Sequence, residues 1–219
     1  MDVAQLQFLA QQLRKPDGDA GRQIGEQMNA GNYLMNKNTL EHLQAPTGAR
    51  ILEIGMGNGH FVKDILATDP TIRYTGCDYA ETMVAEAQAR NAAFQQSGQA
   101  DFMLASASEL PFDNDTFDRI FAVNTIYFWE DPAKELAEIR RVLKPDGKLL
   151  IAARPSWVME QMPFTDYGFT RYSKEQLADV LHNNSFSVIE LEETREPEYT
   201  VNGIVTQMGH MIAIAIKNQ

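Results

Sequence analysis

The segment 50–60, R-I-L-E-I-G-M-G-N-G-H, decides the fold. It opens with a short apolar run over 50–54, which predicts a buried β-strand. Three alternating glycines, Gly55, Gly57 and Gly59, follow, and apolar residues then recur at helical spacing over 61–66. Glycine lets the backbone turn tightly and lets a ligand approach without a Cβ in the way. We therefore predict a strand, a ligand-binding turn and a helix.

The alternation of strand and helix continues toward the C-terminus. Apolar runs predict strands over 72–77, 102–105, 119–123, 148–153, 186–191 and 208–216, and helical periodicity predicts helices over 80–94, 132–143 and 173–182. Such alternation favours an α/β fold with a doubly wound, mostly parallel sheet and right-handed crossovers. The last two strands have no predicted helix between them, so we expect an antiparallel pair at one edge.

Local signals mark the ends of several elements. Asp131 is a predicted N-cap with proline at the first helical position, and Ser173 with Gln176 forms a capping-box pattern. Residues 144–147, K-P-D-G, predict a turn before the strand at 148. Residues 1–45 are polar; they predict one helix around Leu6–Leu13, a break at 15–19 and a second helix over 36–43.

Composition excludes several classes of protein. The chain has 219 residues, which favours one domain, and its net charge is −11, which argues against binding nucleic acid through phosphates. The single cysteine, Cys77, allows no disulfide within the chain, and the four histidines show no metal-ligand spacing. No secretory signal is recognisable and no apolar run approaches the roughly 18 residues of a membrane span. We expect a soluble, cytoplasmic protein without a metal, a membrane or a nucleic acid as partner.

Two acids flank the glycine turn. Asp78 ends the second predicted strand, 19 residues after Gly59, where a carboxylate can accept hydrogen bonds from both ribose hydroxyls of an adenosine ligand. Its alternative role is the N-cap of the helix that follows. Glu53 lies just before the turn, where it would repel a phosphate and suits a cationic ligand with an amino group and a sulfonium. Its alternative role is a structural carboxylate that accepts backbone N–H groups.

Other nucleotide-binding motifs fit less well. A pyrophosphate cofactor favours G-x-G-x-x-G, and here the third glycine comes one residue early. The Gly-Lys-Ser/Thr of a P-loop is absent after the turn. An NAD-dependent oxidoreductase is therefore a weaker alternative.

Three stretches together resemble a known family. I-L-E-I-G-M-G-N-G-H-F (51–61) and G-C-D-Y-A-E-T-M-V (76–84) are similar to the first two motifs of class I S-adenosylmethionine-dependent methyltransferases. The stretch 110–152 contains L-P-F, F-D, D-P and R-V-L-K-P-x-G in the order that type-11 methyltransferases carry. The resemblance covers about residues 48–155. It implies a Rossmann-like methyltransferase fold with a seven-stranded sheet and an antiparallel edge strand.

The resemblance also implies a set of cofactor-binding residues. It makes Glu53, Gly55, Gly57 and Gly59 the contacts of the methionine part, Asp78 the ribose acceptor and Tyr79 a neighbour of the adenine. The family often has an Asp-Ala pair after strand three that holds the adenine edge, and here the matching residues are Ser106 and Ala107. A hydroxyl replaces the carboxylate, although it can still accept from an amino group. Asn124 matches a position at the methionine end; alternatively, it is a strand-end turn residue.

Candidates for chemistry and for the acceptor follow from position. Methyl transfer from a sulfonium needs alignment more than acid–base catalysis, so the lack of a catalytic triad excludes nothing. Tyr127 and His60 are the candidate catalytic residues, and Trp129, Trp157 and Tyr167 are candidates for substrate contact. The alternative for each is packing or, for His60, helix capping.

The sequence therefore predicts methyl transfer from S-adenosylmethionine to a small-molecule acceptor by in-line displacement. We expect residues 1–45 to form an N-terminal helical lid, 46–219 the cofactor-binding domain, and the aromatic segment 155–172 a cap over the acceptor. A non-catalytic S-adenosylmethionine-binding module remains an alternative, because a cofactor-binding half does not establish turnover. The acceptor atom and the oligomeric state are not indicated.

Overall fold

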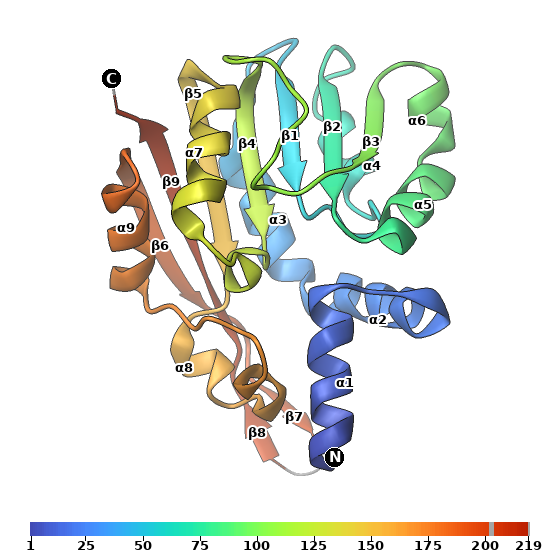
Figure 1. Cartoon of the computed structure of the whole chain (residues 1–219), viewed down its shortest axis with the longest axis vertical. Helices are drawn as coiled ribbons and strands as arrows, with labels where there is room; N and C mark the ends of the chain where they lie inside the picture. Colours follow the sequence, from blue (N-terminus) through green and yellow to red (C-terminus); the bar gives the residue numbers. More distant parts are fainter. Residues whose placement is uncertain (202–203, 219) are drawn as a thin grey trace.

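A seven-stranded sheet forms the centre of the molecule in the computed structural model, which describes residues 1–201 and 204–218 (Figure 1). The strand order is β3-β2-β1-β4-β5-β9-β6. The strands are β1 (Arg50–Ile54), β2 (Arg73–Asp78), β3 (Ala100–Leu104), β4 (Phe117–Val123), β5 (Leu143–Ala153), β6 (Phe186–Arg195) and β9 (Gly209–Lys217), with a separate hairpin of β7 (Tyr199–Val201) and β8 (Ile204–Thr206).

Helices cover both faces of the sheet. They are α1 (Val3–Arg14), α2 (Gly18–Gly31), α3 (Tyr33–Leu43), α4 (Val62–Leu66), α5 (Glu81–Arg90), α6 (Ala92–Gln96), α7 (Pro132–Val142), α8 (Ser156–Met159) and α9 (Lys174–Asn183), with short 3-10 turns at η1 (Ile126–Phe128) and η2 (Pro163–Asp166). Apolar residues of α7 and α9 belong to one core cluster, and those of α3, α4 and α5 belong to the other. The doubly wound architecture that the sequence predicts is confirmed.

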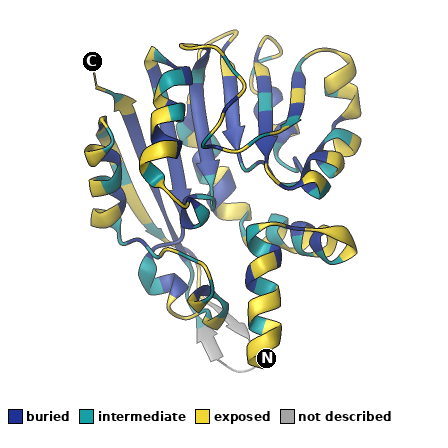
Figure 2. Ribbon diagram, viewed as in Figure 1, coloured by how far each residue is buried: buried dark blue, intermediate teal, exposed yellow. Residues whose placement is uncertain are grey.

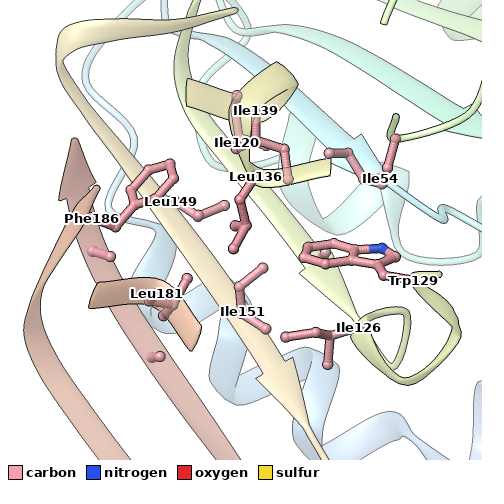
Figure 3. Packing of buried hydrophobic residues seen from close by; sticks show 14 of the residues in the cluster. Ile54, Ile120, Ile126, Trp129, Leu136, Ile139, Leu149, Ile151, Leu181 and Phe186 are labelled. Carbon is pink, nitrogen blue, oxygen red and sulfur yellow. The ribbon is translucent and has the colours of Figure 1, made fainter. Parts of the chain in front are cut away.

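The core is densest on the side of α7 and α9. Leu136 and Ile139 of α7 and Leu181 of α9 pack toward Leu149 and Ile151 of β5, and none of these five side chains is exposed (Figure 3). Strands β1, β4 and β9 are largely buried, whereas the edge strand β6 and helix α1 are largely exposed (Figure 2). A rigid sheet therefore presents the loops at the carboxyl ends of its parallel strands.

The predicted antiparallel pair at one edge is confirmed. β9 pairs antiparallel with both β5 and β6, so it is the strand inserted next to the edge strand β6. The β7–β8 hairpin, which the sequence analysis did not predict, extends this pair beyond the sheet. Residues 202–203 lie outside the described part of the chain.

Three local predictions differ from the structure. The predicted turn at 144–147 is a bulge inside β5, because Phe117 pairs with Leu143 and Arg119 pairs with Lys148. The single predicted helix over 80–94 is broken at Asn91, whose side-chain amide donates to the carbonyl oxygens of Gly59 (2.9 Å) and Ala87 (3.0 Å). Helix α2 was missed, because its sequence is polar and contains four glycines, which have low helix propensity.

The predicted caps are present. Asp131 accepts a hydrogen bond from the backbone N–H of Ala133, and Ser173 and Gln176 form a reciprocal capping box. Within the ranges 1–201 and 204–218, no helix is long and apolar enough to cross a bilayer.

Candidate functional site

A cavity of about 340 Å³ lies where β1, β2 and β4 end, next to α2. Figure 1 shows α2 lying across this end of the sheet, toward which β1, β2 and β4 point. Its wall combines the glycine turn, the ends of β2 and β4, the segment 105–108, and residues of α1, α2 and α3. In an open α/β sheet, ligands bind at the carboxyl ends of the strands.

The glycine turn is held in a backbone conformation that favours glycine. Gly55, Gly57 and Gly59 have φ of +73°, +55° and +65°. A Cβ on Gly55 would lie 2.2 Å from Cγ2 of Thr125, whereas a Cβ on Gly57 would meet no protein atom within 4 Å. Gly55 is thus required for packing, and Gly57 leaves bare backbone against the cavity. Gly59 does not line the cavity and packs on α5, where a Cβ would lie 2.7 Å from the amide nitrogen of Asn91.

Asp78 joins the turn to the end of β2. Its Oδ2 accepts from the backbone N–H of Gly57 (3.0 Å) and its Oδ1 accepts from the N–H of Ala80 (2.9 Å). The N-cap of α5 is Ala80 and not Asp78, so the alternative role predicted for Asp78 is wrong; its second bond precedes the helix. Asp78 also lines the cavity. Burial raises its pKa to about 6, against the opposing effect of these backbone donors. Each oxygen keeps a lone pair for a ligand hydroxyl.

Glu53 is buried at the end of β1 and lines the cavity. Its Oε2 accepts from the hydroxyl of Tyr74 at 2.5 Å. Burial raises the pKa of Glu53 to about 8, although the Tyr74 hydrogen bond acts in the opposite direction. Among the residues that the structure describes, no backbone N–H donates to this carboxylate, in contrast to the structural alternative. A ligand cation placed here would favour the ionised carboxylate.

The expected adenine side contains Tyr79, Ser106 and Ala107, and all three line the cavity. The hydroxyl of Tyr79 donates to the carbonyl oxygen of Arg14, which ties α1 to the end of β2. The hydroxyl of Ser106 lies 2.9 Å from that of Ser108 and also accepts from the N–H of Ser108. Ser106 is therefore hydrogen-bonded within its own turn.

Asn124 and Tyr127 form a unit at the end of β4. Asn124 has a left-handed φ of +58° and lines the cavity. Tyr127 does not line it: its hydroxyl donates to Oδ1 of Asn124 (2.8 Å) and accepts from the N–H of Arg154. Burial raises the pKa of Tyr127 above its usual value. The phenol of Tyr127 therefore lies behind the cavity wall, where its hydroxyl holds the side chain of Asn124.

The remaining candidates divide into two groups. His60 and Trp129 line the cavity. Trp157 does not: its indole N–H donates to Glu193 of β6 at 2.8 Å and its ring lies under Arg195. Tyr167 is also outside the wall, and no residue of 155–172 contributes to it. Phe169 and Tyr172 of this segment pack on the core instead; Phe169 lies against Phe128 with ring centroids 4.6 Å apart.

Several wall residues were missed by the sequence analysis. From α2, α3 and the junction between them come Met28, Asn29, Asn32 and Asn36, which carry no motif. Thr125 and Glu135 also line the cavity, and each has one buried oxygen (Oγ1 and Oε2) without a hydrogen-bond partner among the described residues. A buried oxygen without a partner costs free energy, so such atoms point to a ligand.

These features fit an adenosine cofactor. The cavity has bare backbone at Gly57, a carboxylate with spare acceptor capacity at Asp78, and two oxygens awaiting donors. Glu53 adds an acid suited to a cationic amino acid group.

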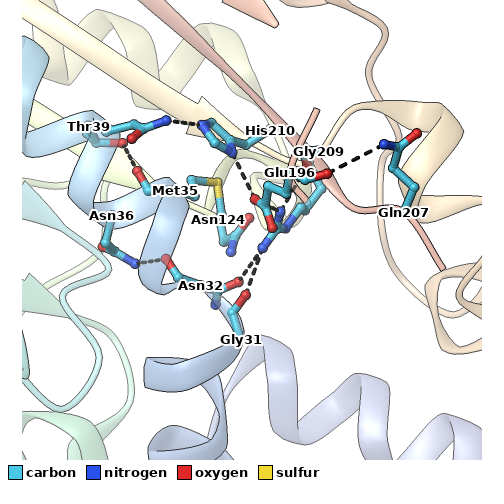
Figure 4. Close-up of polar contacts among 12 residues, drawn as sticks. Gly31, Asn32, Met35, Asn36, Thr39, Asn124, Glu196, Gln207, Gly209 and His210 are labelled. Carbon is cyan, nitrogen blue, oxygen red and sulfur yellow. Dashed lines mark hydrogen bonds and ion pairs between the residues drawn. The ribbon is translucent and has the colours of Figure 1, made fainter. Parts of the chain in front are cut away.

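A buried ion-pair network ties the N-terminal helices to the sheet (Figure 4). Arg154 donates to the carboxylate of Glu196 and to the carbonyl oxygens of Gly31 (2.8 Å) and Gly209 (2.9 Å). His210 Nδ1 lies 2.8 Å from the same carboxylate, and its Nε2 lies 2.9 Å from the amide nitrogen of Asn38. Because that amide nitrogen only donates, the imidazole proton is on Nδ1. Each charged or polar side chain of this network has a hydrogen-bond partner, which indicates a structural role.

His42 lies outside the cavity. Its Nδ1 is 2.8 Å from the carbonyl oxygen of Asn38, and its Nε2 lies 3.6 Å and 3.5 Å from the exposed carboxylates of Glu190 and Glu192. The fold brings these three residues together although the sequence shows no metal-ligand spacing. Exposed carboxylates beside an imidazole form a surface ion pair, and we assign no metal there.

Comparison with known proteins connects this geometry to an activity. A family model described as a methyltransferase domain matches residues 52–151. The chain is 27% identical over 185 residues to the O-methyltransferase resE of Aspergillus sclerotiorum, covering 78% of this chain and 67% of that protein. It is 30% identical over 128 residues to the uncharacterized methyltransferase YdaC of Bacillus subtilis, covering 58% of this chain and 68% of YdaC.

A solved structure supports the fold. A chain in the complex of the Haloferax volcanii Trm112 methyltransferase activator with a methyltransferase superposes with a TM-score of 0.77 at 18% identity, covering 91% of this chain and 95% of that chain. Together with the family match and the cavity, this leads to one conclusion: the chain belongs to the class I methyltransferases, enzymes that use S-adenosylmethionine as the methyl donor.

Proposed function

We propose that this enzyme transfers the methyl group to a hydroxyl oxygen of a small, neutral organic acceptor. The observation that carries the proposal is the acceptor side of the cavity, where the wall from α1 to α3 is neutral apart from Arg14. Arg14 is paired with Glu130 at 2.5 Å. Met28 and the asparagines at 29, 32 and 36 offer apolar area and neutral hydrogen bonds. Similarity to an O-methyltransferase over 78% of the chain supports oxygen as the acceptor atom.

Cofactor binding in this proposal uses the residues at the ends of β1 and β2. Asp78 accepts from the ribose hydroxyls through the lone pairs that Gly57 and Ala80 leave free. Glu53 pairs with the amino group of the methionine part, and Gly55 and Gly57 let that part approach the backbone. Tyr79, Ala107 and Asn124 complete the wall around the cofactor, while Gly59 acts indirectly by letting the turn pack on α5.

Bound S-adenosylmethionine supplies an activated methyl group on a sulfonium. The protein then has to hold the acceptor oxygen in line with that methyl group and exclude water from the line of attack. As the O–CH3 bond forms, the S–CH3 bond breaks, S-adenosylhomocysteine leaves as a neutral thioether, and the hydroxyl proton is released to the solvent. We propose that residues 1–45 act as the lid that does both, because α1, α2 and α3 contribute part of the cavity wall. Of the predicted substrate-contact residues Trp129, Trp157 and Tyr167, Trp129 lines the cavity and can contact the acceptor or the cofactor.

His60 is best suited to donate a hydrogen bond. Nη1 of Arg90 lies 3.4 Å from its Nδ1, and arginine only donates, so Nδ1 holds the lone pair and Nε2 carries the proton. A protonated Nε2 can orient an acceptor oxygen but cannot take a proton from it. We therefore propose an orienting role for His60 in place of a general base.

Product analysis tests the proposed function. The purified protein is incubated with methyl-labelled S-adenosylmethionine and a panel of phenols, enols and alcohols, with amines and thiols as comparison. We expect labelled methyl ethers, identified by mass spectrometry and NMR. Label exclusively on nitrogen, sulfur or carbon would overturn the oxygen assignment. Cofactor binding without turnover of any acceptor would favour the non-catalytic binding module.

A further inference from the structure

A buried carboxylate on the first turn of α7 has no role in the site described so far. Glu135 is only 7% exposed and lines the cavity, yet its Oε2 has no hydrogen-bond partner among residues 1–201 and 204–218. Burial is the main reason that its pKa is raised. A carboxylate oxygen left without a donor destabilises the empty protein, so Glu135 suits a ligand donor.

The contacts of α7 define which part of the cavity Glu135 faces. One turn later, Oε2 of Glu138 accepts from the N–H of Leu110 at 2.9 Å, and Arg141 donates to the carbonyl oxygen of Leu110 at 2.9 Å. Glu135 and Glu138 are three residues apart, so they are neighbours on the surface of the helix. Glu135 therefore faces the segment that precedes Leu110, and residues 105–108 of that segment line the same cavity.

This end of the cavity has few other acceptors among its side chains. The hydroxyl of Ser106 is occupied by Ser108, and Ala107 has no polar side chain. With the ribose on Asp78 and the methionine part on the glycine turn, the segment 105–108 is left for the purine base. Adenine has one hydrogen-bond donor group on its ring system, the 6-amino group, and an unpartnered carboxylate oxygen is an acceptor.

We propose that Oε2 of Glu135 accepts a hydrogen bond from the 6-amino group of the cofactor's adenine and makes the enzyme select adenine. The proposal rests on S-adenosylmethionine binding in this cavity as set out above. A carboxylate from α7 then accepts the hydrogen bond of the 6-amino group, because the hydroxyl of Ser106 is already bonded to Ser108. Glu135 is a binding residue in this proposal and takes no part in methyl transfer.

The test measures base selectivity by calorimetry without turnover. S-adenosylhomocysteine and its 6-oxo analogue, in which hypoxanthine replaces adenine, are titrated into wild-type protein, Glu135→Leu and Glu135→Gln. We expect the wild type to bind the adenine compound about tenfold or more tightly than the analogue, as for a hydrogen bond to a charged group. Glu135→Leu should bind the two with nearly equal affinity. Glu135→Gln should shift toward the analogue, because its amide can donate to the 6-oxygen.

A rescue variant and a matched control complete the experiment. Ser106→Asp combined with Glu135→Leu returns a carboxylate to the same end of the cavity and should restore the preference for adenine. Glu81→Gln, on the exposed first turn of α5, removes a carboxylate elsewhere and should bind both compounds as the wild type does. Thermal unfolding of each variant shows whether it is folded.

Two outcomes overturn different statements. If the wild type and Glu135→Leu prefer adenine by the same factor, the assignment of Glu135 is wrong while the cofactor site stands. If the folded wild type binds neither compound, the cofactor site itself is wrong. If Glu135→Leu does not fold, the Glu135→Gln titration decides by the same criterion.

Discussion

Buried polar groups differ between the cofactor side of the cavity and the ion-pair joint that ties the N-terminal helices to the sheet. On the cofactor side, Glu53 and Asp78 are acids with pKa values raised by burial, and Glu135 has an oxygen with no partner. On the lid side, Arg154, Glu196 and His210 are equally buried, yet each is paired. Buried acids with a raised pKa or an oxygen without a hydrogen-bond partner thus mark the surface that binds a ligand. Buried charged groups that are all paired mark the joint that holds the lid to the sheet.

The largest expected effect comes from breaking the joint. Arg154→Met removes the cation and leaves the carboxylate of Glu196 buried with only His210 as a partner. We expect a loss of about 3–5 kcal/mol in the free energy of unfolding, as for other buried pairs broken on one side. Urea unfolding followed by circular dichroism measures it. Arg22→Met removes an exposed ion pair and should leave the stability nearly unchanged; equal losses in the two variants would contradict a structural role for the joint.

The next prediction concerns Glu53, a buried acid in the cavity wall, and the pH dependence of stability that its raised pKa causes. The pKa of Glu53 is about 8 in the folded protein, against 4.5 for the free side chain. The folded state therefore holds the proton more tightly, and its stability contribution is present below pH 4.5 and is lost as the pH rises toward 8. We expect Glu53→Gln to remove about 3 kcal/mol from the decline in stability of the ligand-free protein between pH 5 and pH 8.

Calorimetry in buffers of different ionisation enthalpy offers a second measurement on Glu53. Binding of S-adenosylhomocysteine at pH 7 should release a proton from this carboxyl, because the ligand's amino group favours the ionised form. Glu53→Gln should show no such release from this position. Proton uptake and release that are identical in wild type and variant would place the amino group elsewhere.

Asp78 should affect ligand binding by a smaller amount. Asp78→Ala leaves two ribose hydroxyls without acceptors, and we expect cofactor binding to weaken by about 1.5–3 kcal/mol. Because the pKa of Asp78 is about 6 in the free protein, affinity should fall as the pH is lowered through 6 and the carboxylate becomes protonated. Titration calorimetry from pH 5 to pH 8 measures both effects. Asp69→Asn, an exposed carboxylate on the loop before β2, is the control, and unchanged affinity in Asp78→Ala would exclude the ribose contact.

The smallest effect is expected at Tyr127, whose hydroxyl contacts both Asn124 in the cavity wall and the backbone of Arg154 in the joint. Tyr127→Phe removes the hydroxyl that holds Asn124 and Arg154, at a cost of about 1–2 kcal/mol in stability. A positioning role predicts that turnover falls more than cofactor affinity does. Steady-state kinetics compared with calorimetry distinguishes this from packing, which would change both by the same factor. Asn124→Asp, which keeps an acceptor for the Tyr127 hydroxyl, should retain the cofactor affinity better than Asn124→Leu.

The contrast between the cavity and the joint also explains which functional residues could be predicted from the sequence. Gly55, Gly57 and Asp78 act through backbone geometry within about one βαβ unit, so their spacing along the chain reveals them. Helix α2 and Asn32 carry no such spacing, because contacts with distant segments place them at the cavity. Glu26 of α2 pairs with Arg90 of α5, and Asn32 accepts from Arg154, 122 residues away in sequence. Trp157 and Tyr127 have suitable residue types, but their neighbours direct one toward β6 and the other into the core.

The sequence by itself determined the parallel α/β sheet, the glycine turn and the acid after the second strand, because these depend on local periodicity and on residues that only a tight turn accepts. Only the tertiary structure decided that α2 forms a wall of the cavity, that Tyr127 lies behind it, and that Glu135 has a free oxygen inside it. A side chain's burial and hydrogen-bond partners come from segments that are distant along the chain. A local sequence pattern therefore does not predict them.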